Sequence, residues 1–109
     1  MKKGFIYIIT NKNKTTLYIG VTSNLEGRIL QHKCGVGSIF TSKYHLTELM
    51  YFEELDDIES AIRREKQLKN WHRDWKWNLI QSSNQQLRDL AADWYSAEEL
   101  ELFKKHNVL

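Results

Sequence analysis

Two short apolar runs lie near the start of the chain. Residues 5–10 and 17–22 are rich in β-branched and aromatic side chains, and the polar residues 11–14 separate them. This pattern is typical of two strands joined by a turn, so we expect an antiparallel hairpin. A third apolar run within residues 46–55 predicts a third strand.

The first helix should begin directly after the hairpin. Residues 23–26 match the S-x-x-E capping box, in which a serine and a glutamate side chain bond backbone amides at the start of a helix. We expect this helix to run to about Lys33, because glycines follow it. The residues from Gly35 to about His45 predict a flexible loop.

The second half of the chain has helical periodicity. Asp56 or Asp57 can cap a helix, and apolar residues recur three or four positions apart after it. Residues 82–92 predict a polar connection, and a second capping box at residues 96–99 predicts a C-terminal helix. The expected apolar positions are Ile58, Ala61, Ile62 and Leu68, then Trp71, Trp75 and Leu79, then Leu87 and Leu90, and finally Leu100, Phe103 and Val108.

These elements predict an α/β protein of the α+β type, with a small three-stranded antiparallel sheet flanked by helices and an extra C-terminal helix. A chain of 109 residues is long enough for one core. We expect residues 1–92 to form the domain and residues 93–109 to extend it. No apolar run approaches the roughly 20 residues that span a bilayer, and no signal sequence precedes the first strand, so a cytoplasmic location without membrane partners is expected.

Cysteine and histidine usage argues against a permanent structural metal. The single cysteine, Cys34, excludes an intramolecular disulfide and a multi-cysteine zinc site, and the four histidines are scattered. We expect Cys34 to be a small semi-buried filler. A magnesium ion held loosely by one carboxylate is compatible with the sequence, because such sites keep most of their waters.

Positive charge is concentrated in one segment. The net charge is only +2, so a basic surface for nucleic acid has to be local. Basic residues crowd positions 63–76, directly after the acidic stretch 53–59. The alternative is a solvated helix face with i,i+4 ion pairs such as Glu59 with Arg63. The residues expected to contact phosphates are Lys43, Arg63, Arg64, Lys69 and Arg73.

Three charged or titratable residues are suited to phosphodiester hydrolysis. Arg28 and His32 are four positions apart and therefore share a helix face. A guanidinium matches phosphate oxygens, and an imidazole with a pKa of about 6.5 can act as a base or relay. Glu65 falls on an apolar helix position, where a carboxylate needs a partner or a metal.

Each of these residues has a structural alternative. Tyr7 and Tyr18 on the strands are more often sheet aromatics, and a neutral phenol needs activation before it acts as a base. A helical histidine is usually structural or exposed, and Arg28 could pair with a surface carboxylate. Glu65 could form an ion pair with Arg64 or Lys69.

Several residues in order resemble a known family. The residues Tyr7, Tyr18-Ile19-Gly20, Arg28, His32, Glu65 and Asn84 are similar to the motifs of the GIY-YIG nuclease superfamily. The resemblance covers roughly residues 4–90 and is strongest to the small single-domain bacterial branch. That branch is related to the N-terminal nuclease domain of the excision-repair C subunit. Further similarity lies at residues 18–23, 35–38, 40–41, 43–44 and 64–69.

The resemblance implies a metal-dependent endonuclease that hydrolyses phosphodiester bonds in DNA, in DNA repair or processing. It implies one weakly held Mg²⁺ or Mn²⁺ ion on Glu65. The alternative is a module with the same fold that binds nucleic acid without cleaving it, and a homodimer or protein partner at the C-terminal helix is a third expectation. The implied catalytic residues are Tyr7, Tyr18, Arg28, His32 and Glu65, with Gly20 and Asn84 in support.

The sequence departs from the family pattern at several positions. Phe5 replaces the first glycine, and Gln85 replaces a usual proline. Val21 stands where the excision-repair branch carries a lysine, and Gly27 and Ile39 stand where the small branch often has basic residues. The absence of these basic side chains is expected to weaken DNA binding more than catalysis.

Overall fold

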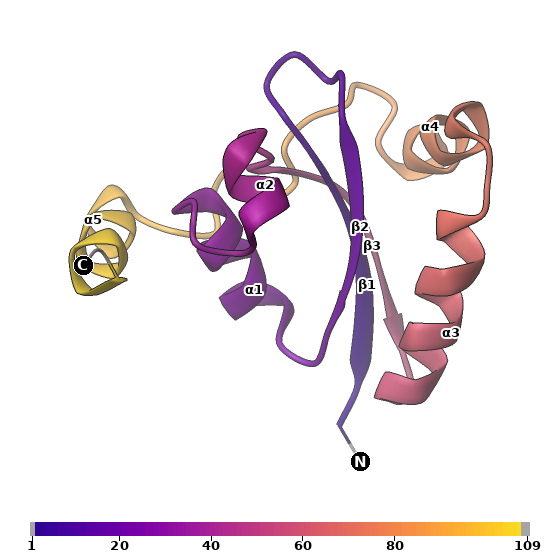
Figure 1. The fold of residues 1–109 in the computed structure, drawn as a ribbon, viewed down its shortest axis with the longest axis horizontal. Coiled ribbons are helices and arrows are strands. Elements are labelled where there is room, and N and C mark those ends of the chain that lie inside the picture. The colour runs from indigo at the N-terminus through magenta and orange to yellow at the C-terminus, as the bar shows by residue number, and fades with distance from the viewer. Residues whose placement is uncertain (1, 108–109) are drawn as a thin grey trace.

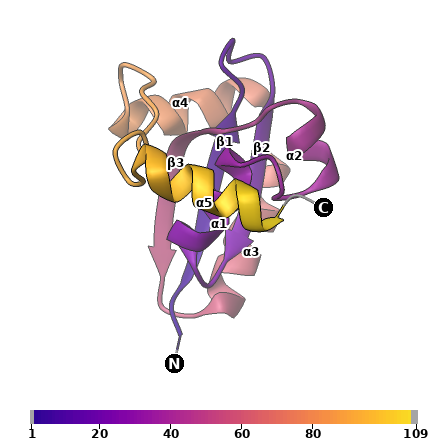
Figure 2. The same cartoon turned by 90° about the vertical axis from the view of Figure 1, so that its left-hand side faces the viewer.

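The computed structural model describes residues 2–107 and confirms the predicted α+β fold. The sheet is antiparallel with strand order β2-β1-β3. Helices α1 and α2 lie on one face, α3 and α4 lie on the other, and α5 lies beyond α1 (Figures 1 and 2). The strands are β1 (Gly4–Thr10), β2 (Leu17–Thr22) and β3 (Glu48–Leu55), and the helices are α1 (Leu25–Lys33), α2 (Ile39–Lys43), α3 (Ile58–Lys69), α4 (Arg73–Ser83) and α5 (Ala97–Asn107).

The central strand, β1, is buried on both faces, which explains its nearly continuous apolar sequence. Ile6 and Ile8 face α3 and α4, and Tyr7 and Ile9 face α1. Successive side chains of a strand point to opposite faces, so one strand supplies both halves of the core. The α3 side is completed by Ile19, Met50, Ala61, Leu68 and Ile80, and the α1 side by Leu25, Ile29, Leu46, Leu49 and Ala91.

The predicted hairpin of β1 and β2 is confirmed, and the two strands pair along their whole length. The side-chain oxygen of Asn11 accepts hydrogen bonds from the amides of Thr15 and Thr16 at 2.9 and 3.2 Å. These bonds hold the polar turn closed, so the asparagine has a local structural role.

Two predictions for residues 23–45 are wrong. The cap of α1 is Asn24 rather than Ser23, because the Asn24 side chain accepts a hydrogen bond from Gly27 N at 3.1 Å. The expected flexible loop contains α2, which Ser38 caps by accepting a bond from Thr41 N at 3.1 Å. A five-residue helix is too short to produce a recognisable apolar period, so sequence pattern alone does not reveal it.

The tryptophan stripe predicted after α3 is divided in the structure. Trp71 packs against the core together with Trp77 and Leu79, whereas Trp75 is 54% exposed. Because α4 begins at Arg73, Trp71 precedes the helix, and four-residue spacing does not place it on the helix face of Trp75.

The connection between α4 and α5 covers the outer edge of β3. Leu90 N donates a hydrogen bond to Leu49 O at 2.8 Å, and the buried Asn84 amide donates to Met50 O at 3.1 Å. The buried anchor of this connection is Ala91 rather than the expected Leu90, which is exposed. The connection satisfies backbone groups that an open edge strand would present to other chains.

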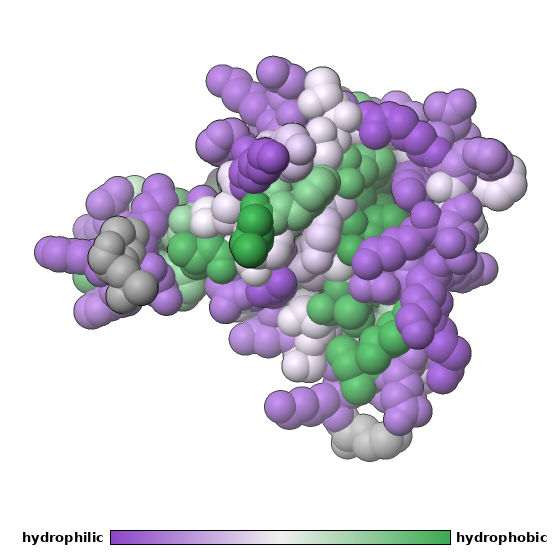
Figure 3. All heavy atoms as spheres, viewed as in Figure 1, coloured by the Kyte–Doolittle hydropathy of each residue, from purple (hydrophilic) through white to green (hydrophobic). Residues whose placement is uncertain are grey.

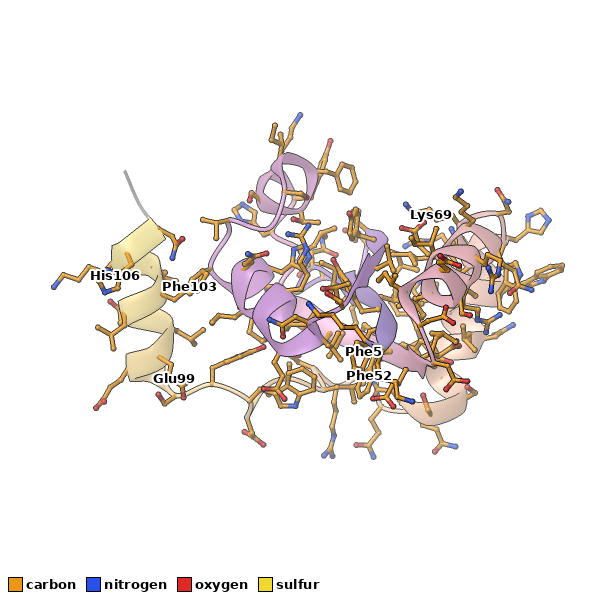
Figure 4. All side chains as sticks on the ribbon, turned by 90° about the horizontal axis from the view of Figure 1, so that it is seen from below. Phe5, Phe52, Lys69, Glu99, Phe103 and His106 are labelled. Carbon is orange, nitrogen blue, oxygen red and sulfur yellow. The ribbon has the colours of Figure 1, made fainter. Side chains whose placement is uncertain are left out.

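Helix α5 begins at the predicted capping box. Ser96 Oγ accepts from Glu99 N at 3.0 Å, and Glu99 Oε1 accepts from Ser96 N at 3.2 Å. Phe103 points from α5 toward α1 (Figure 4). Cys34 contacts the Leu100 carbonyl, and burial raises the pKa of its thiol, which agrees with a filler role.

The boundary at residues 92 and 93 and a protein contact through α5 stay predictions. The half-buried Leu100 and Phe103 belong to the expected apolar stripe of this helix, and Val108 lies outside the described residues. No helix within residues 2–107 is long and apolar enough to cross a membrane.

Replacement of Asn84 by alanine should lower the free energy of unfolding by about 1–3 kcal/mol. Its amide also donates to Arg88 O at 2.8 Å and its oxygen accepts from Arg88 N at 3.0 Å, so the change leaves buried backbone groups without partners. Urea unfolding of Asn84→Ala against the exposed control Gln85→Ala measures this. Equal midpoints for the two variants would contradict a structural role for Asn84.

Candidate active site

The Tyr7 ring lies directly against the backbone of Gly20. The two residues are paired across β1 and β2, and a Cβ at position 20 would overlap the Tyr7 phenol. Only glycine therefore lets the tyrosine ring lie flat across β2. Because β2 is an edge strand, the Tyr7 hydroxyl reaches the border of the sheet although the residue is 1% exposed.

The Tyr7 hydroxyl joins two side chains of α1. It lies 2.8 Å from His32 Nε2, and Arg28 Nε donates to it at 3.4 Å. Helix α1 brings the arginine and the histidine to one face, as their four-residue spacing predicts. The structure thus brings together three of the predicted residues.

Burial sets the protonation states of this cluster. It raises the pKa of Tyr7 to about 12, although the Arg28 charge acts in the opposite direction. Burial and the Arg28 charge lower the pKa of His32 to about 4. At neutral pH the imidazole is therefore uncharged and the phenol is protonated.

A second hydrogen bond holds the His32 ring on its other side. His32 Nδ1 lies 3.1 Å from Thr41 Oγ1, which in turn lies 2.8 Å from Ser38 Oγ. A neutral imidazole carries one proton, so the tautomer with the proton on Nδ1 donates to Thr41 and leaves Nε2 to accept from Tyr7. A Cβ at Gly37 would overlap the imidazole, so this glycine leaves room for the ring.

Sequence reasoning did not identify Gly37, Ser38 or Thr41 as part of the site. The first belongs to a Gly-x-Gly stretch and the other two to the start of α2. The available signal was a glycine followed by two hydroxyl residues near a helix bearing a histidine. That signal is weak without knowledge of α2.

Tyr18 lies beside this cluster on β2. Its ring centroid is 6.4 Å from that of Tyr7 and 6.0 Å from that of His32. It is half-buried and makes no side-chain hydrogen bond within residues 2–107, so its hydroxyl is available to a ligand.

Glu65 approaches the cluster from α3, on the other side of the sheet. Its side chain is 14% exposed and pairs with Lys69 Nζ at 3.3 Å. The Glu65 charge makes only a small contribution to raising the pKa of Tyr7, behind burial and the Tyr18 hydroxyl. The predicted inward orientation of Glu65 is confirmed. Of the two basic residues that could pair with it, Lys69 does so. Figure 4 shows Lys69 on the side of the sheet away from α5.

The predicted phosphate contacts do not form one continuous cluster. Arg64 is occupied by a bidentate pair with Glu53, at 2.9 Å for each bond, and Arg73 donates to Thr15 O at 2.9 Å. The exposed Arg63 bonds Ser60 Oγ at 3.0 Å, and the expected pair with Glu59 is not among the ion pairs of residues 2–107. Lys43 is exposed on α2, and its Nζ lies over the Tyr44 ring.

The donor set fits one loosely held divalent cation rather than a closed metal cage. Within residues 2–107 no group of three or more histidine, cysteine, aspartate or glutamate side chains could enclose an ion. Glu65 offers a single carboxylate near the sheet edge, and Mg²⁺ commonly binds through one or two carboxylates, waters and substrate phosphate.

Comparison with known families matches residues 3–78 to the GIY-YIG catalytic domain. The chain belongs to the GIY-YIG family. Membership places it among nuclease domains and implies a nucleic-acid substrate. Helix α5 lies beyond the matched residues.

Small bacterial GIY-YIG relatives cover the same region. A UPF0213 protein of Staphylococcus haemolyticus is 35% identical over 74% of this chain and 98% of its own length. A UPF0213 protein of Syntrophus aciditrophicus is 32% identical over 80% of this chain and all of its own length, and one of Clostridium perfringens is 36% identical over 73% and 85%. No solved structure matches the chain.

The stability of the GIY-YIG domain should fall in weak acid because His32 is buried uncharged. Its folded pKa of about 4 lies below the unfolded value, so between pH 6.5 and 4 the unfolded chain binds a proton that the folded chain does not. The His32 contribution to the free energy of unfolding should drop by up to about 3 kcal/mol over this window, and it should be level above the window and below it.

Urea unfolding at a series of pH values measures this dependence, with His32→Gln as the comparison because other groups also titrate. The difference between the two proteins isolates the imidazole. Parallel curves from pH 6.5 to 4 would contradict a buried neutral His32.

Proposed function

We propose that the chain is a divalent-metal-dependent endonuclease that hydrolyses phosphodiester bonds in DNA, with a role in DNA repair or processing. The observation that carries the proposal is the hydrogen-bonded contact of Tyr7 with His32 and Arg28, beside Tyr18. A guanidinium, a neutral imidazole and two phenols meet at the border of the sheet, where the half-buried Arg28 and Tyr18 are the members of the cluster that a strand of DNA can reach.

Arg28 is the phosphate ligand in this proposal. Its Nε donates to Tyr7 and its Nη1 donates to Gln31 Oε1 at 2.8 Å. These two bonds hold the planar guanidinium still and leave Nη2 without a bond to the described residues. A fixed cation stabilises the charge that develops on phosphoryl oxygens without having to reorganise during the reaction.

Tyr7 and His32 form the proton path. As a water attacks phosphorus, its proton passes to the Tyr7 oxygen while the Tyr7 proton passes to His32 Nε2, so the phenol stays neutral overall. The negative charge of a bound phosphodiester would raise the pKa of His32 and make the imidazole a better acceptor. The free Tyr18 hydroxyl can orient the water or a phosphoryl oxygen.

Glu65 is the residue that would hold Mg²⁺ or Mn²⁺. The ion, when bound, supplies charge stabilisation at the phosphoryl and leaving oxygens. The ion pair with Lys69 occupies the carboxylate in the absence of metal, so Lys69 must turn aside or share it. Lys69 is half-exposed and flexible enough to turn toward a phosphate instead.

Replacement of Glu65 by glutamine should reduce cleavage by at least about 100-fold, because loss of a bound metal removes several kcal/mol of transition-state stabilisation. Nicking of supercoiled plasmid with Mg²⁺ or Mn²⁺ measures this. Glu59→Gln is the matched control, since Glu59 is an exposed carboxylate on the same helix. Equal nicking by Glu65→Gln and wild type would mean that the cleavage does not come from this site.

The second candidate is a nucleic-acid-binding module with this fold that does not cleave. The ion pair of Glu65 with Lys69 favours it, because it neutralises the carboxylate that the metal requires. Salt-dependent DNA binding by wild type without nicking in Mg²⁺ or Mn²⁺ would select this candidate.

A further inference from the structure

An exposed apolar surface adjoins the proposed active site. Ile39 is 90% exposed, and Phe40, Tyr44 and Val36 are 45%, 43% and 41% exposed. They lie on or next to α2, and Figure 3 shows hydrophobic side chains at the surface in this region. We call Val36, Ile39, Phe40 and Tyr44 the α2 surface. A shallow hollow lies between Val36, Ile39 and Lys43.

The α2 surface is continuous with the catalytic cluster through a row of neighbouring aromatic rings that are tilted relative to one another. The Phe40 centroid lies 6.1 Å from that of Tyr18 and 4.9 Å from that of Tyr44. Since Tyr18 lies beside Tyr7, one row of rings leads from the Tyr7 hydroxyl to the outside. Lys43 Nζ lies 5.4 Å from the Tyr44 ring centroid and places a cation at the outer end of the row.

The α2 surface is also held rigidly relative to the catalytic histidine. Thr41, in the middle of α2, is buried and bonds His32 Nδ1. Leu46 N donates to Thr41 O at 2.9 Å, and Ser42 Oγ bonds Gly35 O. The exposed apolar side chains are therefore not on a loose loop, and their exposure is maintained by bonds to the site itself.

Resting on the proposed function, we propose that the α2 surface binds unstacked nucleobases next to the scissile phosphate. Aromatic side chains stack on bases, and exposed aliphatic side chains such as isoleucine wedge between base steps. The row of rings fits the bases of one strand, and Lys43 fits a phosphate of that strand. The substrate class is accordingly DNA with unpaired or mismatched bases beside the cleavage point.

The preference for unpaired bases follows from the energy of unstacking. In an intact duplex the base faces are covered by their neighbours, and exposing one costs a few kcal/mol. That cost is smallest for a base that is already mismatched or unpaired. A surface of rings and an isoleucine recovers stacking energy only from such bases, whereas Lys43 contacts phosphate in any DNA.

Binding in EDTA tests this inference separately from cleavage. The probes are a fluorescein-labelled duplex and the same duplex with a bulge of unpaired thymines. Wild type should bind the bulged DNA at least about fivefold more tightly, because stacking contributes about 1–3 kcal/mol per base. Ile39→Ser should lose most of this preference and keep its affinity for the intact duplex, and Leu102→Ser, also an exposed apolar residue, should behave as wild type.

Ile39→Lys provides a test in the opposite direction. The added cation should increase affinity for the intact duplex and steepen its salt dependence, while the preference for bulged DNA falls. Phe40→Leu should reduce the fluorescence quenching of a 2-aminopurine placed in the bulge, because leucine has no ring on which the base can stack. Circular dichroism confirms the fold of each variant, and Ile39, at 90% exposure, is free to change without altering the core.

Three results would overturn the inference. The first is an equal affinity of wild type for the intact and the bulged duplex. The second is a loss of affinity in Ile39→Ser that is the same for both duplexes. The third is a change in molecular mass of Ile39→Ser by light scattering, which would make the α2 surface a contact between copies of the chain. Nicking without a bulge preference refutes only this inference, whereas an Ile39-dependent bulge preference without nicking refutes only the hydrolytic function.

Discussion

The contact of the Tyr7 ring with the backbone of Gly20 determines the geometry of the site. A side chain at position 20 would lift the phenol from the sheet and separate its hydroxyl from both α1 residues. The same contact lets a residue of the central strand act at the border of an edge strand. The Tyr7 phenol is thereby carried on the central strand, which neighbouring strands hold on both sides, as a rigid site requires.

The buried imidazole of His32 links Tyr7 to α2 on the α1 face of the sheet. Its two nitrogens bond residues from β1 and from the start of α2, so one uncharged ring holds three elements in register. Burial favours the uncharged imidazole and lowers the pKa of His32. The ring that stabilises the fold is therefore a weak proton acceptor. In the proposed function, an approaching phosphate would raise the pKa of His32 and so link proton transfer to the presence of substrate.

The sheet, α1 and the order of the site residues were predictable because they depend on local spacing. The β-branched and aromatic composition of two short runs placed Tyr7 and Tyr18 on strands, four-residue spacing placed Arg28 and His32 on one face, and the resemblance to the family joined them in one site. The role of Thr41 and the pairing of Arg64 with Glu53 were not predictable, since they depend on how α2 and β3 approach residues distant in sequence. The cap of α1 could not be assigned to a single residue from the sequence. Ser23 and Asn24 both suit a helix cap, and the backbone geometry selects Asn24.

The connection that covers β3 also contacts α1. Asp89 accepts a bond from Leu49 N in β3 and pairs with Lys33, the last residue of the helix that carries Arg28 and His32. This connection lies beyond residues 3–78, the region shared with the family. A fragment cut at that limit would carry an uncovered edge strand and an α1 without its ion pair to Asp89, and such edges pair readily with other chains. The contacts that complete the sheet edge and α1 therefore extend beyond the region by which the family is defined.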